Sequence, residues 1–253
     1  MTPVSIGILV FAVTFTGALA GLWLRGVLPA HQLNSESQAT VKLGIGLVAT
    51  MTALVLGLVT ASAKNSYDEL DGAVKHTAAD LLSLDRVLAR YGPESEPVRE
   101  ALRSAVVGTI MKSWPQATSD PATLKLGNSP RTGEGVVQLI RALPDQDAEK
   151  GWLKARALDI GERLLDVRWV VISSIGTSVP VPFLVVLVFW LVVIFISFGL
   201  FAPRNGTVIA VLFVCALSVA SAIFLILEMD GPFSGLIRIS PDPMNYALSQ
   251  MAQ

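Results

Sequence analysis

Five small or hydroxyl-bearing residues recur along one face of an apolar segment, and their chemistry suits ion conduction. Small side chains leave room at the centre of a helical assembly, and threonine hydroxyls can contact a partly dehydrated ion. The alternative is close helix packing, because small residues let two backbones approach each other in lipid. The pattern favours packing over a pore, and both hold in an oligomer whose centre is built from this helix. The five residues lie at alternating steps of 4 and 3: Gly46, Thr50, Ala53, Gly57 and Thr60.

A second group of candidate residues is acidic and lies at the ends of apolar segments. Asp68, Glu69 and Asp71 follow the second such segment within about two helical turns. Repeated around a symmetry axis, they would form a carboxylate ring that concentrates cations or binds Ca²⁺. Their alternative role is the solvated start of a charged helix. Glu228 and Asp230 close the last apolar segment, where a carboxylate either has an assigned partner or is exposed to lipid headgroups.

The chain lacks the residue sets that common enzymes need. His31 and His76 are its only histidines, Cys215 is its only cysteine, and it has no G-x-S-x-G, phosphate-binding-loop or H-E-x-x-H motif. We therefore predict no enzymatic activity, no resident cofactor and no metal site, with Ca²⁺ at the acidic positions as the one exception to consider. His76 and Asp80 could hold a metal with a partner helix, although such a pair is more often exposed. Cys215 lies in an apolar run and is predicted to be a small buried hydrophobe.

Four uncharged segments are long enough to cross the roughly 30 Å hydrocarbon layer as helices. Composition agrees, with 52% apolar and 15% charged residues and a mean hydropathy of +0.59. Ala18-Leu19-Ala20 resembles a signal-peptide cleavage site, but no Lys or Arg precedes the first segment and the apolar run continues beyond it. We therefore predict four spans, with both termini and the region between spans two and three on one side of the membrane. The segments are 4–24, 43–63, 183–201 and 208–227.

The second span is predicted to continue into water as one helix over 42–91. Residues spaced alternately 4 and 3 form an a/d seam along 70–91, and Gly92-Pro93 then ends the helix. The same spacing returns over 153–171, which predicts an antiparallel bundle of the outgoing and returning helices. Between them we expect a helix over 95–114, a loop over 116–135 and a short helix over 136–142. Gly176, Pro180 and Pro182 are expected to break the returning helix, and Ser240 to Pro243 to leave the tail irregular.

Charge is concentrated between the second and third spans. Residues 63–178 hold 15 Lys/Arg and 16 Asp/Glu, and the rest of the chain holds 4 of each. This balance gives no electrostatic reason to expect nucleic acid as a partner. We predict an all-α membrane protein with four transmembrane helices plus an extramembrane helical bundle inserted between spans two and three. The expected divisions are spans one and two at 1–62, the bundle at 63–178, spans three and four at 179–230 and a tail at 231–253.

Three stretches of the sequence resemble a bacterial and plant membrane family that has a bestrophin-like domain. They are Leu-Asp-Arg-Val-Leu-Ala-Arg-Tyr-Gly-Pro-Glu at 84–94, Ser-Phe-Gly-Leu-Phe-Ala-Pro-Arg-Asn at 197–205, and the run at 216–240 that contains Glu-Met-Asp-Gly-Pro-Phe-Ser-Gly. Bestrophins are oligomeric anion channels with four membrane segments per subunit, a pore around the second segment and a helical cytosolic region that can bind Ca²⁺. The resemblance implies the same layout here. The second span of this chain carries no aromatic pore neck, and no acidic Ca²⁺ clasp follows the fourth.

These features together predict an oligomeric bestrophin-like ion channel with its pore along the second span. We expect a multi-pass protein of the bacterial inner membrane whose helical domain faces the cytoplasm. Its expected partners are the lipid bilayer, further copies of the same chain and inorganic ions. The competing hypothesis is a non-conducting membrane scaffold or sensor whose helical domain docks a partner protein. The two hypotheses differ in whether Thr50 and Gly57 face water or are buried against another helix.

Overall fold

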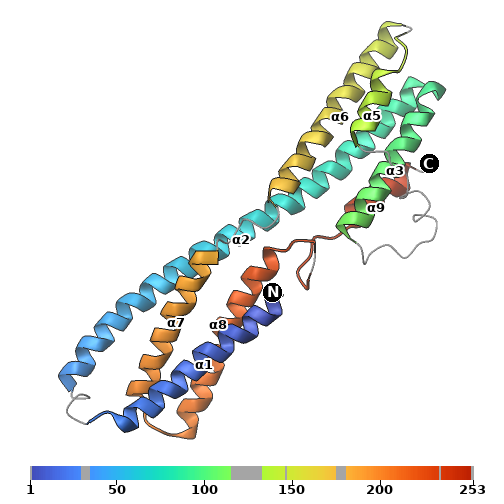
Figure 1. Cartoon of the computed structure of the whole chain (residues 1–253). Helices are drawn as coiled ribbons and strands as arrows, with labels where there is room; N and C mark the ends of the chain where they lie inside the picture. Colours follow the sequence, from blue (N-terminus) through green and yellow to red (C-terminus); the bar gives the residue numbers. More distant parts are fainter. Residues whose placement is uncertain are drawn as a thin grey trace. The chain divides into compact units, whose positions relative to one another are not determined.

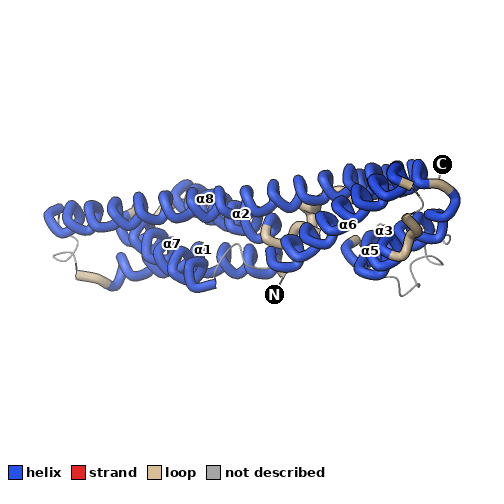
Figure 2. Tube along the Cα trace, turned by 90° about the horizontal axis from the view of Figure 1, so that it is seen from above, coloured by secondary structure: helices blue, strands red, loops and turns tan. Residues whose placement is uncertain are grey.

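The computed structural model describes residues 2–29, 35–114, 133–145, 147–174, 181–233 and 235–251. These residues form helices and contain no strand (Figure 2). Four of the described helices are long and apolar enough to cross a membrane, so the predicted fold class and number of spans are confirmed. The spans lie in α1 (Pro3–Val27), α2 (Ser35–Tyr91), α7 (Val181–Phe201) and α8 (Gly206–Met229). The other described helices are η2 (Pro93–Ser95), α3 (Glu96–Ser113), α5 (Gly133–Arg141), α6 (Ala148–Ser174) and α9 (Asp242–Met251).

The chain divides into two compact units. The membrane unit comprises Met1–Ser66 and Gly176–Gly231, and the helical unit comprises Tyr67–Ile175 and Pro232–Gln253. The long helix α2 therefore contributes its first part to one unit and its second part to the other. The residues after the fourth span, from Pro232 on, belong with the helical unit.

In the membrane unit, α1 packs closely against α7 and α8 (Figure 1). Glycines allow the contact with α7, because a Cβ at Gly21 would collide with the carbonyl of Ile196 and a Cβ at Gly199 with the carbonyl of Ala18. Small residues at a crossing are the usual means of close approach in lipid. On the α8 side, aromatic rings of both helices meet edge to face. These three helices form the packed core of the membrane unit.

Two arginines close the end of the membrane unit where the short connections between spans lie. Arg25 Nη1 donates to the carbonyl of Ala202 at the end of α7. Arg204 Nη2 donates to Leu22 O at 2.9 Å and to Trp23 O at 3.2 Å. Ala202 directly follows α7, so Arg25 caps the C-terminal end of that helix, where a cation also interacts favourably with the helix dipole. Leu22 and Trp23 lie within the last two turns of α1, so Arg204 ties the connection between α7 and α8 to that helix.

The predicted seam along α2 forms the core of the helical unit. Six of its seven members are buried, and Thr77 is partly buried. Leu153, Ala157 and Ile160 of α6 belong to the same apolar cluster. The six buried members of the α2 seam are Leu70, Val74, Leu81, Leu84, Leu88 and Tyr91.

Two ion pairs show that α2 and α6 run antiparallel. Asp80 Oδ1 lies 3.6 Å from Arg163 Nη2, and Glu94 Oε1, just after α2, lies 2.8 Å from Lys150 Nζ. Residue numbers fall along one helix as they rise along the other, so the pair is antiparallel. The predicted antiparallel packing of the outgoing and returning helices is confirmed (Figure 1).

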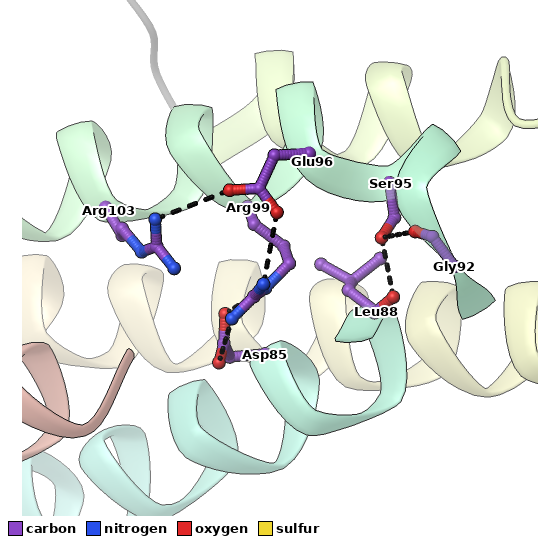
Figure 3. Close-up of polar contacts among 7 residues, drawn as sticks. All are labelled: Asp85, Leu88, Gly92, Ser95, Glu96, Arg99 and Arg103. Carbon is purple, nitrogen blue, oxygen red and sulfur yellow. Dashed lines mark hydrogen bonds and ion pairs between the residues drawn. The ribbon is translucent and has the colours of Figure 1, made fainter. Parts of the chain in front are cut away.

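The turn between α2 and α3 explains the motif at 84–94. Gly92 has a φ of 119°, a backbone conformation that favours glycine. The buried hydroxyl of Ser95 donates to Leu88 O at 2.5 Å and lies 2.8 Å from Gly92 O, so it satisfies carbonyls at the end of α2 (Figure 3). Asp85 then accepts two hydrogen bonds from Arg99 of α3. The motif therefore builds a rigid helical corner.

The chain after the fourth span docks on α3. Trp114 donates its indole N–H to Ile239 O at 2.8 Å, and its ring meets that of Phe233 edge to face at 5.2 Å between centroids. Met244 and Ala247 of α9 are buried in the core of the helical unit. The closing part of the motif at 216–240 therefore attaches the C-terminal segment to the helical unit.

Three element boundaries differ from the sequence prediction. Helix α2 begins at Ser35, seven residues earlier than expected. Helix α5 begins at Gly133, inside the expected loop. The C-terminal residues form α9, because Pro243 lies in its first turn, where proline is tolerated.

The prediction for Cys215 is wrong, because its side chain is exposed on α8. The outward face of a span meets lipid, so an apolar run does not tell which of its residues are buried in protein. Several other predicted features lie outside the described residues. They are His31, the loop over 116–132 and the helix break at Gly176 and Pro180.

Candidate functional site on the second span

The membrane segment of α2 is far less covered by its own chain than the other spans are. Only 6% of its most apolar 18-residue window is buried, against 33% for α1 and 28% each for α7 and α8. Buried backbone polar groups are satisfied within a helix, so an exposed span is stable in lipid or against another protein surface. Most of the surface of this helix is therefore available to lipid, to water or to another chain.

One side of α2 packs within the membrane unit. Thr52 and Ala63 are buried, and Val55 and Leu56 pack against the apolar cluster of α1, α7 and α8. Because these residues recur at helical spacing, they define a single attached face. The other sides of the helix are exposed.

The five small residues predicted to line a pore all lie on an exposed part of α2. A Cβ added at Gly46 or at Gly57 would meet no atom within 4 Å among the described residues. These glycines are therefore not used for close packing within the chain, in contrast to Gly21 and Gly199. The structure brings together Gly46, Thr50, Ala53, Gly57 and Thr60 as one continuous surface, which we call the small-residue stripe.

A ridge of large apolar side chains, not predicted from the sequence, runs beside this stripe. Its members are 48–78% exposed. The signal was present in the sequence as a repeat of leucines at helical spacing, but any apolar span contains such residues. The ridge consists of Leu43, Leu47, Met51, Leu54 and Leu58.

The threonine hydroxyls of the stripe donate to their own helix. Thr50 Oγ1 donates to Leu47 O at 2.8 Å, and Thr60 Oγ1 donates to Leu56 O at 2.7 Å. With the hydrogen used in this way, the oxygen lone pairs are left for an outside donor or a cation. Contact with an anion would require the hydroxyl to rotate away from the backbone.

The acidic residues beyond the membrane segment do not share one face. Asp68 and Asp71, three residues apart, lie on neighbouring positions of the helix surface, whereas Glu69 is directed elsewhere. Asp71 Oδ2 lies 2.7 Å from Lys75 Nζ. This pairing raises the pKa of Lys75 through its hydrogen bond with the carboxylate. A ring built on this helix would therefore include Asp68 and Asp71 but leave Glu69 to one side.

The two carboxylates at the end of the fourth span differ in exposure. Glu228 is only 3% exposed although it lies in the last turn of α8. Asp230 is the C-terminal cap residue of the same helix and is partly buried. Two roles were considered for Glu228, an assigned partner or exposure to lipid headgroups. Its burial argues against exposure to headgroups.

The residues considered as metal ligands have other surroundings. Asp80 pairs with Arg163 of α6, and His76 is exposed. Among the described residues no group of three His, Cys, Asp or Glu side chains converges as metal ligands would. The suggestion of Ca²⁺ stays a prediction.

Ion pairs shift the pKa of several groups in the helical unit. The hydrogen bond from Lys150 lowers the pKa of Glu94 and raises that of Lys150 itself. The hydrogen bond to Asp85 raises the pKa of Arg99 further above its usual value, and the bond to Asp159 does the same for Arg163. These contacts hold helices in place, and none lies on the small-residue stripe.

A cavity of about 590 Å³ in the membrane unit was also missed by the sequence analysis. Residues of α2, α7 and α8 line it, among them Lys42, Gly46 and Phe198. No sequence pattern could have found it, because α2 is far along the chain from the α7–α8 hairpin that forms its other walls.

The fold defines the class of protein. Four membrane-spanning helices, with a helical unit formed by the chain between the second and third spans and after the fourth, make this a multi-pass helical membrane protein that contacts the lipid bilayer. The Bestrophin-like domain family matches residues 12–244. The chain therefore belongs to the Bestrophin-like family, as the resemblance indicated. No curated protein matches it in sequence.

Proposed function

We propose that this protein is a homo-oligomeric ion channel whose pore is lined by the small-residue stripe of α2. The observation that carries the proposal is the exposure of that stripe in a membrane span that its own chain hardly covers. In a ring of subunits, the stripe of each copy would face the common axis. Its small side chains would leave space there, and its hydroxyl and backbone oxygens would replace part of the hydration shell of a passing ion.

The remaining faces of α2 fit the same arrangement. The attached face, with Thr52 and Val55, holds the helix to α1, α7 and α8. The leucine ridge beside the stripe would contact the neighbouring α2 helix or lipid. Family membership supports a membrane role. The conducted ion would be a small inorganic one, because the stripe offers threonine hydroxyls and glycine backbone.

Cysteine accessibility tests which face of α2 meets water. The background is Cys215→Ser, which removes the one native thiol. Thr50→Cys and Gly57→Cys place a thiol on the stripe, and Met51→Cys places one on the ridge as the matched control. In reconstituted liposomes, charged water-soluble thiol reagents should change ion flux through the first two variants and leave the third unchanged. Modification of all three alike, or of none, would contradict a water-filled path along the stripe.

Flux and assembly of Thr50→Lys separate a channel from a scaffold. If the stripe lines a pore, a lysine there finds water, so the oligomer persists and its selectivity between anions and cations changes. If the stripe is packed against another helix, the buried charge disrupts the oligomer. Tracer flux is measured with anion and cation gradients separately, and subunit number by native mass spectrometry. A folded oligomer without flux, with and without Ca²⁺, would exclude the channel and favour the scaffold.

A further inference from the structure

The cavity in the membrane unit lies between α2, α7 and α8. Its volume of about 590 Å³ falls in the range of sites that hold small organic ligands. The walls are mainly aliphatic and aromatic, with Phe198, Phe201 and Val211 among them. Phe198 is 48% exposed and Val211 is 56% exposed, so the cavity opens toward the surroundings of the spans. An apolar molecule can therefore enter it from the hydrocarbon layer.

One cation lines the rim of this cavity. Lys42 directly precedes the uncharged segment of the second span, which puts its ammonium near the level of the lipid headgroups. The described part of the chain offers its ammonium no carboxylate within ion-pair distance. Arg25 and Arg204, at the same end of the unit, already donate to backbone carbonyls. Lys42 is thus the charge at this end that is available to a ligand.

The polar residues at the rim fit the same ligand. Thr207, in the first turn of α8, and Ser197 of α7 also line the cavity. The cavity therefore combines mainly apolar walls with one cationic residue and two hydroxyl-bearing residues. A molecule with one or more acyl chains and an anionic headgroup matches both parts.

A second copy of the chain fits this cavity less well. At this end of the spans the sequence carries three cations, Arg25, Lys42 and Arg204, against the single acid Glu36. A neighbouring copy would thus bring mostly like charge toward Lys42, whereas an acidic lipid brings the opposite charge. Charge complementarity therefore favours an acidic lipid over a second copy of the chain as the occupant of the cavity.

We propose that this cavity binds an acidic phospholipid, with an acyl chain against Phe198 and Val211 and the phosphate on Lys42 Nζ. Gly46 of the small-residue stripe lines the same cavity, so the lipid would lie beside that stripe. The proposal does not rest on ion conduction, because a scaffold would bind the lipid equally well.

Native mass spectrometry of the full-length protein tests the site with defined lipids. Phosphatidylglycerol and phosphatidylcholine of equal chain length are added in parallel, and retained lipid is measured per chain. Wild-type protein should retain the acidic lipid preferentially. Lys42→Gln should lower that preference about fivefold, the effect expected of one cation near a membrane surface, and Lys42→Arg should restore it. Lys64→Gln, at the other end of the same span, is the matched control and should change nothing.

A second variant tests the cavity independently of the charge. Val211→Trp fills the interior and should reduce retention of both lipids while leaving the oligomer intact. Equal retention of the two lipids by wild type, or no effect of either Lys42→Gln or Val211→Trp, would overturn the proposal. So would loss of the oligomer in Val211→Trp with lipid retention unchanged, because another copy would then occupy the cavity.

Discussion

Arg99 of α3 holds the carboxylate of Asp85 of α2 through two nitrogens, with Nε 2.8 Å from Oδ1 and Nη2 3.1 Å from Oδ2 (Figure 3). Both side chains are largely buried, with 16% of Arg99 and 9% of Asp85 exposed. Glu96 adds a second contact to Arg99 at 3.1 Å. Bidentate pairs fix geometry as well as adding energy, so this contact sets the angle at which α3 leaves the long helix.

Asp85→Asn should destabilise the helical unit by about 3 kcal/mol, because it leaves a mostly buried guanidinium without its main counter-charge. Asp145→Asn is the matched control, since Asp145 pairs with Lys154 at 3.2 Å but is 61% exposed. An exposed pair contributes less than about 1 kcal/mol. Urea unfolding of detergent-solubilised protein, followed by helical circular dichroism, measures both changes. Equal losses for the two variants would show that the Asp85 pair has no special structural role.

Gly199→Ala should disrupt the crossing of α1 and α7, because its Cβ would collide with the carbonyl of Ala18. Gly57→Ala is the matched control in another span, where a Cβ meets no described atom within 4 Å. We expect a reduced yield of monodisperse protein and a lower melting temperature for the first variant only. Gel filtration and thermal unfolding in detergent provide the measurement. A Gly57→Ala variant that is as damaged as Gly199→Ala would instead place Gly57 in a tight helix contact.

Trp114→Phe should loosen the C-terminal segment. The substitution keeps an aromatic ring near Phe233 but removes the indole donor to Ile239 O, and a buried carbonyl left without a donor is unfavourable by about 1–3 kcal/mol. Arg238 is exposed beside this contact, so limited trypsin digestion should cut there several times faster in the variant. Trp152→Phe, at a position 64% exposed, should leave the rate unchanged. An unchanged rate in Trp114→Phe would mean that other contacts hold the segment.

The sequence was sufficient for the long helices and their directions because the patterns that specify them are local, whereas the short helix α9 was missed. The uncharged segments and the seam from Leu70 to Tyr91 follow from spacing along one helix. The cavity beside Lys42, the burial of Glu228 and the exposure of Cys215 were not predictable, since each depends on which helices meet. In lipid this limit is stronger than in water, because an apolar side chain does not reveal whether it faces protein or membrane. The small-residue stripe was identified from spacing, but its exposure could be learned only from the packing of the other three spans.

The pair of Glu94 and Lys150 should make the stability of the helical unit depend on acid pH. The hydrogen bond from Lys150 lowers the pKa of Glu94 from its usual 4.5 in the folded state. A carboxylate with a lowered folded pKa contributes stability that is present above the unfolded value and is lost as pH falls through the folded one. The melting temperature of wild type should therefore fall as pH drops below about 4.5.

Glu94→Gln removes this titrating group, so its melting temperature should change less than that of wild type as the pH is lowered below about 4.5. Lys150→Gln should flatten the profile in the same way, because Glu94 then loses the partner that lowers its pKa. Glu134→Gln, which removes an acidic residue from the first turn of α5, is the control for loss of a carboxylate elsewhere. Parallel profiles for wild type and Glu94→Gln would show that the pair is too solvent-screened to stabilise the packing of α6 on the end of α2.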